Sequence, residues 1–378
     1  MAILDVQHIE KHFGDTPVLK DISFSLEEGQ ALSIIGSSGS GKTTLLRCLN
    51  FLETPDKGII SVRGEKLFDA AEHDSRSESD IRKKRLHFGL VFQSFNLFPQ
   101  YTALQNVTLA RELMAKSEKT GESHESIVAE GRRLLEDIGL GQRMDNYPHQ
   151  LSGGQQQRVA FARALVMGQE ILLLDEPLSN LDAKLRVDVR TELRQIQQKL
   201  GITTIYVTHD QDEALSMSDI IAVMRSGHIE QIGSPWEIYF RPANRFVADF
   251  VGTVNFLTAR IVSAEGGTVA ADHNGMLLQI PTEVPVEPGE TVTLVVRPEC
   301  IRLAEPGESV PEGKSLEGQI ENYSFLGRMI RYWVRVGEEQ FIIDDANVDL
   351  SGARSGAVQL CLDTRKLHIL KDGGSHDT

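Results

Sequence analysis

Residues 36–43 read GSSGSGKT and settle the architecture of the first half of this chain. They fit the pattern G-x-x-x-x-G-K-[ST], follow the apolar run ALSIIG (31–36) and open the run KTTLLRCLNFL (42–52). Glycines let backbone N–H groups surround phosphate oxygens, a lysine supplies positive charge, and a threonine hydroxyl is a ligand for Mg²⁺. The pattern therefore predicts a nucleotide phosphate site at Gly36, Ser37, Ser38, Gly39, Ser40, Gly41, Lys42, Thr43 and Thr44.

Continuous apolar runs in the first half indicate strands that are buried on both faces, as in a parallel sheet covered by helices. These runs are ALSIIG (31–36), ILLLD (171–175) and TTIYVTH (203–209). Helical segments lie between them at 42–52, 126–139 and 182–201, and the last one ends at Gly201. We therefore expect residues 1–240 to form an α/β domain.

The second half has a different pattern. Short apolar runs follow one another at 256–262, 276–280, 291–298, 329–336, 358–363 and 366–370. In MIRYWVRV (329–336) apolar and polar side chains alternate, which is typical of a half-buried strand. Regularly spaced short strands predict a small all-β barrel or sandwich over 241–370, with a disordered tail at 371–378. The polar stretches 69–85 and 116–126 are expected to be solvated loops.

Composition limits the class of protein. A length of 378 residues suits two or three domains, and a net charge of −15 disfavours binding to nucleic acid. No apolar run reaches the roughly 20 residues that a membrane helix needs, and the N-terminus lacks a signal-peptide pattern. The scattered Cys48, Cys300 and Cys361 are expected to be reduced, in a cytoplasmic protein. His273, among polar neighbours, is expected at the surface.

Several single residues have both a functional and a structural interpretation. Asp175 ends an apolar strand and fits a carboxylate that holds Mg²⁺, while Glu176 could polarise an attacking water. His209 and Gln93 follow other strands, where ligands of open α/β sheets bind. The structural alternatives are a histidine bonded to a loop carbonyl and a surface glutamine. Phe13 is either a stacking platform for a base or a packing residue.

A second potential anion site lies far from the first in the chain. LSGGQ (151–155) precedes the helical run QQQRVAFARALVM, so backbone N–H groups and a positive helix end face an anion. One nucleotide needs only one phosphate cradle, and the pattern leaves the second one unexplained.

Taken together, these motifs resemble the nucleotide-binding subunits of ATP-binding-cassette (ABC) transporters over residues 1–240. The resemblance implies that 36–44 is the phosphate loop for ATP and that Phe13 stacks on adenine, in place of the usual tyrosine. It makes Asp175 the magnesium carboxylate, with Thr43 and Gln93 as further Mg²⁺ ligands, Glu176 the general base and His209 the γ-phosphate sensor. Gln93 also links the nucleotide to the membrane partner.

The same resemblance explains LSGGQ, the signature of the family. Two subunits pack head to tail, and each ATP lies between one chain's phosphate loop and the other chain's Ser152, Gly153, Gly154 and Gln155. The segment SNLD (179–182), which includes Asp182, crosses to the other subunit. The resemblance thus implies a homodimer that ATP closes and hydrolysis opens.

The remaining partners also follow from the resemblance. An integral membrane permease is expected, with a solute-binding protein indirectly involved, and this chain would lie on the inner face of the cell membrane. A short permease helix would dock near Gln93, on Phe95, Leu97, Phe98 and Tyr101, unless these side chains pack inward.

Residues 241–370 resemble the oligomer-binding-fold (OB-like, TOBE) accessory domain of import ATPases, through VRPECIRL (296–303) and YSFLGRMIRYWVRV (323–336). Importers with this domain carry polyamines, ferric iron, sugars, sulfate or molybdate. The segment 91–110 is more similar to polar amino-acid importers, whereas the chain from DEPLSNLDAKLR onward favours a polyamine or ferric iron. The alternatives are a soluble ABC ATPase that acts on nucleic acid or ribosomes, and a regulatory binding module.

Overall fold

The computed structural model describes residues 2–72, 78–118, 121–305, 308, 310, 315–348 and 352–371. The chain divides into two compact units, residues 1–235 and 236–378, and the cut falls beside the boundary expected near residue 240. Of the predicted disordered tail, all but Lys371 lies outside the described residues.

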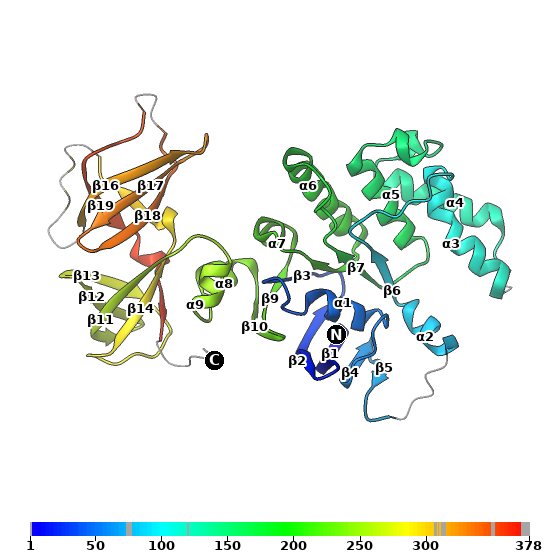
Figure 1. Cartoon of the computed structure of the whole chain (residues 1–378), viewed down its shortest axis with the longest axis horizontal. Helices are drawn as coiled ribbons and strands as arrows, with labels where there is room; N and C mark the ends of the chain where they lie inside the picture. The colour runs from blue at the N-terminus through cyan, green and yellow to red at the C-terminus, as the bar shows by residue number, and fades with distance from the viewer. Residues whose placement is uncertain are drawn as a thin grey trace. The chain divides into compact units, whose positions relative to one another are not determined.

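A six-stranded sheet forms the centre of the first unit, in the order β10-β9-β3-β8-β7-β6 (Figure 1). Its strands are β3 (Ala31–Gly36), β6 (Phe88–Val91), β7 (Ile171–Asp175), β8 (Thr203–Val207), β9 (Ile220–Arg225) and β10 (His228–Gly233). All neighbours are parallel except β10, which is antiparallel to β9. The predicted parallel sheet is confirmed, but β8 ends at Val207, so Thr208 and His209 follow the strand.

Helices cover both faces of this sheet, as its apolar strands require. They are α1 (Lys42–Leu49), α3 (Ala103–Glu118), α4 (His124–Asp137), α5 (Gly153–Leu165), α6 (Ala183–Leu200) and α7 (Gln211–Met217). Alternate residues of one strand serve opposite faces: Leu173 belongs to the core with α1, whereas Leu172 and Leu174 belong to the core with α3 to α6. The predicted helices are confirmed, and Gly201 caps α6 with φ 63°.

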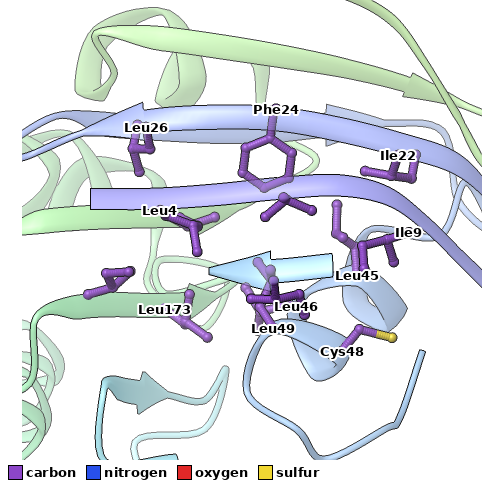
Figure 2. Packing of buried hydrophobic residues seen from close by; sticks show 14 of the residues in the cluster. Leu4, Ile9, Ile22, Phe24, Leu26, Leu45, Leu46, Cys48, Leu49 and Leu173 are labelled. Atoms are coloured by element: carbon purple, nitrogen blue, oxygen red, sulfur yellow. The ribbon is translucent and has the colours of Figure 1, made fainter. Parts of the chain in front are cut away.

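An antiparallel sheet that the sequence did not predict completes the unit, in the order β2-β1-β4-β5. It consists of β1 (Ala2–Phe13), β2 (Thr16–Glu27), β4 (Lys57–Val62) and β5 (Glu65–Asp69). Figure 2 shows its side chains, among them Leu4 and Phe24, above Leu46 and Leu49 of α1 and Leu173 of the central sheet. Helix α1, which carries the phosphate loop at its start, is thus held between two sheets.

Both predicted loops were wrong in part. Residues 78–85 form the helix α2 (Glu78–Arg85), which buries none of its residues, while 73–77 lie outside the described residues. The stretch 116–126 overlaps the end of α3 and the start of α4, with 119 and 120 not described. Both stretches are therefore helical in part, where a loop was expected.

The second unit contains two five-stranded antiparallel sheets, ordered β13-β12-β11-β14-β20 and β15-β19-β16-β17-β18. The strands are β11 (Asn255–Glu265), β12 (Thr268–His273), β13 (Met276–Pro281), β14 (Thr291–Val296), β15 (Ile301–Leu303), β16 (Leu316–Phe325), β17 (Ile330–Val336), β18 (Glu339–Asp345), β19 (Ala357–Leu362) and β20 (His368–Leu370). One core cluster draws residues from both sheets, such as Leu294 and Phe341. The all-β prediction is confirmed, although β12, β15, β16 and β18 were not predicted. The short helices α8 (Pro235–Phe240) and α9 (Arg245–Phe250) precede the strands.

His273 contradicts its expected place at the surface, because its side chain is buried. The ring bonds to Thr258 O through Nδ1 at 2.8 Å and contacts the ring of Phe341 in the other sheet. The thiols of Cys48 and Cys300 are buried and free, as expected, and burial raises the pKa of Cys48 to about 12. Within the described residues, we find no helix with the length and apolarity required to span a membrane.

Candidate functional site

The carboxyl edge of the central sheet gathers most of the predicted nucleotide residues. The phosphate loop follows β3, Gln93 follows β6, Asp175 ends β7 and His209 follows β8. Because β3, β8, β7 and β6 are adjacent and parallel, these segments emerge at the same edge. The topology therefore brings together residues from distant parts of the first unit's sequence.

Two glycines of the phosphate loop are fixed by close backbone contacts. A Cβ on Gly36 would lie 2.2 Å from Met224 O, and one on Gly41 would lie 2.8 Å from Val18 O. Gly41 has φ 102° and precedes α1, whose first turn has no side-chain cap and no acidic residue. The first backbone N–H groups of α1 therefore remain available to an anion.

Lys42 lies within this loop rather than extending into solvent. Its Nζ donates hydrogen bonds to Gly36 O and Ser37 O, both at 2.9 Å. Burial lowers the pKa of Lys42, while the nearby charges of Glu176 and Asp175 act in the opposite direction. The ammonium group is thus held where the loop would enclose a phosphate.

The carboxylates at the end of β7 form a negative centre beside the loop. Burial, and next the charge of Glu176, raise the pKa of Asp175, against the opposing effects of Arg47 and Lys42. A partly buried carboxylate beside a second acid is a donor set that a hard cation stabilises. Asp175 and the exposed Thr43 therefore fit Mg²⁺.

Glu176 has an unusual backbone conformation for a residue with a side chain. Its φ is 47°, in the left-handed region, which costs about 1–3 kcal/mol and often marks a functional residue. The conformation is held by hydrogen bonds from Glu176 N to Val207 O at 2.8 Å and from Ser179 to Glu176 O. The turn directs the side chain to His209, with Glu176 Oε1 and His209 Nδ1 3.2 Å apart.

Gln93 is joined to this loop cluster through its backbone. Asn180 Nδ2, in the SNLD segment, donates a hydrogen bond to Gln93 O at 2.8 Å. The Gln93 side chain is exposed. Sequence reasoning gave Asn180 no role of its own, although it lies within SNLD, and it missed Arg47, whose charge opposes the rise in the pKa of Asp175. Arg47 has no sequence signal beyond its nearness to the phosphate loop.

Phe13 lies at the end of β1, where it pairs with Thr16 of β2. Its side chain is 48% exposed, and Lys11 Nζ lies 5.4 Å from the ring centroid. The β1–β2 hairpin runs beside the phosphate loop, since Val18 O adjoins Gly41. The ring is therefore an open aromatic surface on a hairpin that borders the loop.

The structure places the signature residues away from this edge. Figure 1 shows α5 well separated from α1 within the first unit. Ser152 caps α5 by accepting a hydrogen bond from Gln155 N, while Gln155 Oε1 accepts one from Ser152 N. The backbone N–H of Gln155 is thus bonded within the cap of its own helix, and the backbone N–H groups of Gly153 and Gly154 remain available to an anion.

The two signature glycines also have a packing role. A Cβ on Gly154 would lie 2.6 Å from Val189 Cγ2, and one on Gly153 would lie 2.9 Å from Leu181 Cδ2. Asp182 caps α6 by accepting a hydrogen bond from Leu185 N. Because the preceding residue, Leu181, adjoins Gly153, Asp182 lies beside the signature. The predicted residues therefore form two separate groups, a phosphate-loop group and a signature group.

One buried side chain, missed by sequence reasoning, connects the two groups. Gln157, the third residue of the QQQ run, lies on α5 and donates a hydrogen bond from Nε2 to Pro177 O at 2.7 Å. Pro177 directly follows Glu176. The signature helix is thus tied to the turn that holds the catalytic candidate.

The predicted aromatic cluster near Gln93 divides in two. Phe95 and Leu97 pack against the core, as the inward alternative stated, whereas Phe98 is 43% exposed and contacts Tyr101 edge to face. The buried Asn106 holds this loop through its bonds to Phe98 N and to Phe98 O and Tyr101 O. Phe98 is therefore an exposed aromatic on a fixed loop.

Comparison with known proteins finds a separate family match in each of the two units of the chain. The family model described as "ABC transporter" matches residues 19–179, and the model described as "TOBE domain" matches 294–370. A Brucella melitensis protein named for Fe(3+) ion import is 39% identical over 96% of both chains. A Chromobacterium violaceum protein named for spermidine/putrescine import is 41% identical over 89% of both. A sulfate/thiosulfate import protein of the latter organism is 42% identical over 88% of this chain and 84% of that protein.

Solved structures show the same fold for the first unit. The Clostridium perfringens cbiO1 protein, part of an ABC transporter complex, matches with a TM-score of 0.56 and 30% identity, over 66% of this chain and 92% of that one. An ATP-binding cassette solved as a dimer in a post-hydrolysis state, with ADP and Pi, matches with a TM-score of 0.51 and 31% identity, over 61% and 98%. The predicted fold class, an α/β P-loop unit followed by a small all-β OB-like domain, is confirmed. The chain therefore belongs to the ABC transporter family, in the group of import ATP-binding proteins that carry a TOBE domain.

Proposed function

We propose that this protein is the ATP-hydrolysing subunit of an ABC importer, and that two copies close around two ATP molecules. The observation that carries the proposal is the separation of the predicted site into a phosphate-loop group and a signature group. Each group is built to receive an anion, and one subunit uses only one of them per nucleotide. A second copy, packed head to tail with two-fold symmetry, joins each phosphate-loop group to a signature group.

In this proposal the phosphate-loop group binds the nucleotide. The first N–H groups of α1 and Lys42 Nζ hold the phosphates, and Phe13 stacks on the base. Thr43, Asp175 and Gln93 would hold Mg²⁺, which would supply positive charge to neutralise the phosphates. Lys42 leaves its bonds with Gly36 O and Ser37 O to reach the phosphate oxygens, and Gly36 and Gly41 keep the backbone close to them.

Hydrolysis depends on the residues that follow β7 and β8. Glu176 accepts a proton from the attacking water, and its strained turn keeps the carboxylate at the sheet edge. His209, which contacts Glu176, bonds the γ-phosphate in this proposal. Ser152 and the N–H groups of Gly153 and Gly154 bind the γ-phosphate of the other subunit's ATP, with Asp182 beside them. Loss of the γ-phosphate removes these bonds and opens the dimer.

Coupling to transport requires a membrane partner. We propose that an integral membrane permease contacts the loop of Phe98 and Tyr101 and holds this chain at the inner face of the cell membrane. Since Gln93 O is bonded to Asn180, a permease that moves the loop after β6 would act on the segment that follows Glu176. Similarity to relatives named for iron and polyamine import supports ferric iron or a polyamine as the transported substrate.

The test is a gentle affinity purification of the chain from its native membranes, with a Lys42→Ala chain that should lose ATP binding as the control for activity. Recovery of a polytopic permease, with ATPase activity that the Lys42→Ala chain lacks, would support the proposal. The solute-binding protein of that permease would then be titrated with spermidine and with ferric citrate. Recovery of ribosomes or nucleic acid, without a permease, would instead indicate a soluble ABC ATPase.

A further inference from the structure

The second unit contains a cleft of about 910 Å³ that takes no part in the nucleotide site. Its walls come from α8, from residues 281–285 at and after the end of β13, and from residues 365–368, which lead into β20. All of these belong to the unit that begins at Trp236, so the cleft exists within one folding unit.

Stacked aromatic rings form one wall of this cleft. The rings of Trp236 and Phe240 are nearly parallel, with 15° between their planes and 5.6 Å between their centroids. Phe240 is partly buried against the core, whereas Trp236 is 74% exposed. An exposed tryptophan held flat on an anchored ring presents an aromatic face that a planar ligand can cover.

Helix α8 is fastened firmly, so this aromatic face has a fixed position. The buried Arg297 donates hydrogen bonds from Nε and Nη2 to Tyr239 O, at 3.0 and 2.9 Å, and from Nη1 to Ala248 O at 2.8 Å. Its guanidinium also lies 4.2 Å from the centroid of the Tyr239 ring. Because the backbone of α8 is bound at its last turn, binding here would require little rearrangement.

The lining of the cleft is also rich in positive charge. Arg365 and Lys366 line the cleft together with Arg241, against one lining carboxylate, Glu283. Arg365 and Lys366 share Asp363, at 3.0 and 3.9 Å, so one carboxylate serves two cations. In a chain with a net charge of −15, this local group of cations favours an anion.

A neutral hydrogen-bonding group completes the lining. Burial lowers the pKa of His368, so its imidazole is uncharged at neutral pH. The side chain adds polar contact without adding charge. The cleft thus combines an aromatic face, three exposed cations and a neutral polar group, as sites for small organic ligands do.

We propose that this cleft binds a small organic anion with a planar apolar part, whose ring covers Trp236 and whose anionic group bonds Arg365 and Lys366. This site is separate from ATP hydrolysis and from the transported substrate. A ligand there would contact α8 through Trp236 and Phe240.

Trp236 itself reports on binding. The chain has two tryptophans, and Trp333→Phe leaves Trp236 as the single source of indole emission. We would titrate the full-length Trp333→Phe protein with phenyl phosphate, with inorganic phosphate and with benzylamine at constant ionic strength. We expect a saturable change with phenyl phosphate, binding about tenfold weaker or worse for inorganic phosphate, and no saturable change with benzylamine.

Variants locate the binding site. Arg365→Gln/Lys366→Gln, at exposed positions, should weaken phenyl phosphate binding about tenfold or more, whereas Arg328→Gln, an exposed cation of the same unit outside the cleft, should have no effect. The proposal is overturned if phenyl phosphate gives no saturable change, if benzylamine or inorganic phosphate binds equally well, or if the double variant binds like its parent.

Discussion

Glu176 and His209 face each other across the carboxyl ends of two neighbouring strands, with 3.2 Å between Glu176 Oε1 and His209 Nδ1. They come from segments after β7 and β8, which are paired in parallel register up to Asp175 and Val207. The pairing of the strands, together with the left-handed turn at Glu176, therefore fixes the contact. The fold thus holds the proposed base in contact with the neighbouring imidazole.

Replacement of Glu176 by glutamine tests the assignment of the base. Glu176→Gln keeps the size of the side chain and removes its ability to accept a proton. ATP binding should remain, hydrolysis should fall by roughly 10²–10⁴-fold, and the protein should accumulate as a dimer with Mg-ATP. Steady-state ATPase assays and light scattering measure the two effects.

Glu170→Gln, just before the opposite end of β7, is the matched control and should hydrolyse ATP normally. A Glu176→Gln protein that retains wild-type hydrolysis would rule out this residue as the base. A monomer at saturating Mg-ATP would argue against closure by ATP alone.

Much of the first unit was predictable because its signals are local. The phosphate loop is a contiguous motif. The strands β3, β7 and β8 are short apolar runs, so their burial can be predicted without knowing which strands they pair with. The sheet of β1, β2, β4 and β5 was missed because register shifts at Val6–Ile9 and at further points of β1 break the alternation of apolar residues. Helix α2 was missed because Ile81, which packs against the core, is its single apolar residue and gives no helical periodicity.

The resemblance already divided the candidate residues between a phosphate-loop group and a signature group, but the sequence did not predict the contacts that position each group. The roles of Phe13, Gln93 and His209 came from family resemblance, since each has an ordinary structural interpretation. The contacts of Gln157 with Pro177 O and of Asn180 with Gln93 O join residues 20 and 87 positions apart. His273 was misplaced for the same reason, because its burial depends on Phe341 in another sheet.

The raised pKa of Asp175 predicts a gain of stability when its charge is removed. Burial holds this pKa above the ordinary value of 3.8, so the folded protein retains the proton more strongly than the unfolded chain. The protonated carboxyl of Asp175 therefore favours the folded state. This stabilisation is complete below the pKa of the unfolded chain and is lost as pH rises through the pKa of the folded protein. In the absence of nucleotide, Asp175→Asn should therefore unfold at a higher temperature than wild type at pH 7, with a smaller difference in acid.

Thermal unfolding at several pH values measures this effect, at about 2–4 °C for each kcal/mol gained. Asp188→Asn, at an exposed position on α6, should give no comparable gain. If Asp175→Asn is less stable than wild type at pH 7, burial of the ionised Asp175 carboxylate does not destabilise the fold as expected.

The close approach of α5 and α6 predicts coupling between Gly154 and Val189. The Cβ in Gly154→Ala would overlap Val189 Cγ2, so this variant should lose about 1–3 kcal/mol of stability. Val189→Ala makes room for it, and Gly154→Ala/Val189→Ala should be destabilised by less than the sum of the single changes. Denaturant unfolding of all four proteins gives the coupling, and strict additivity would show that the contact does not restrict Gly154.

Phe98 is the exposed part of the proposed permease contact. Phe98→Asp should abolish transport in the assembled importer, while basal hydrolysis by the isolated subunit stays within about twofold of wild type. Leu113→Asp, at an exposed apolar position on α3, is the matched control and should transport normally. Equal loss of transport and of basal hydrolysis in Phe98→Asp would show that the residue supports the fold instead.

The central claim is that one subunit's phosphate loop meets the other subunit's signature across ATP. The most direct measurement is thiol cross-linking between a chain with Ser38→Cys and a chain with Ser152→Cys, both carrying Glu176→Gln, with Mg-ATP. Both serines are exposed, whereas Cys48 and Cys300 are buried and Cys361 is half-buried, so the parent protein gives the background. The account predicts a covalent dimer in the mixture with ATP, and none from either chain alone or without nucleotide. A mixture that stays monomeric with ATP, or that cross-links equally without it, would contradict the shared site.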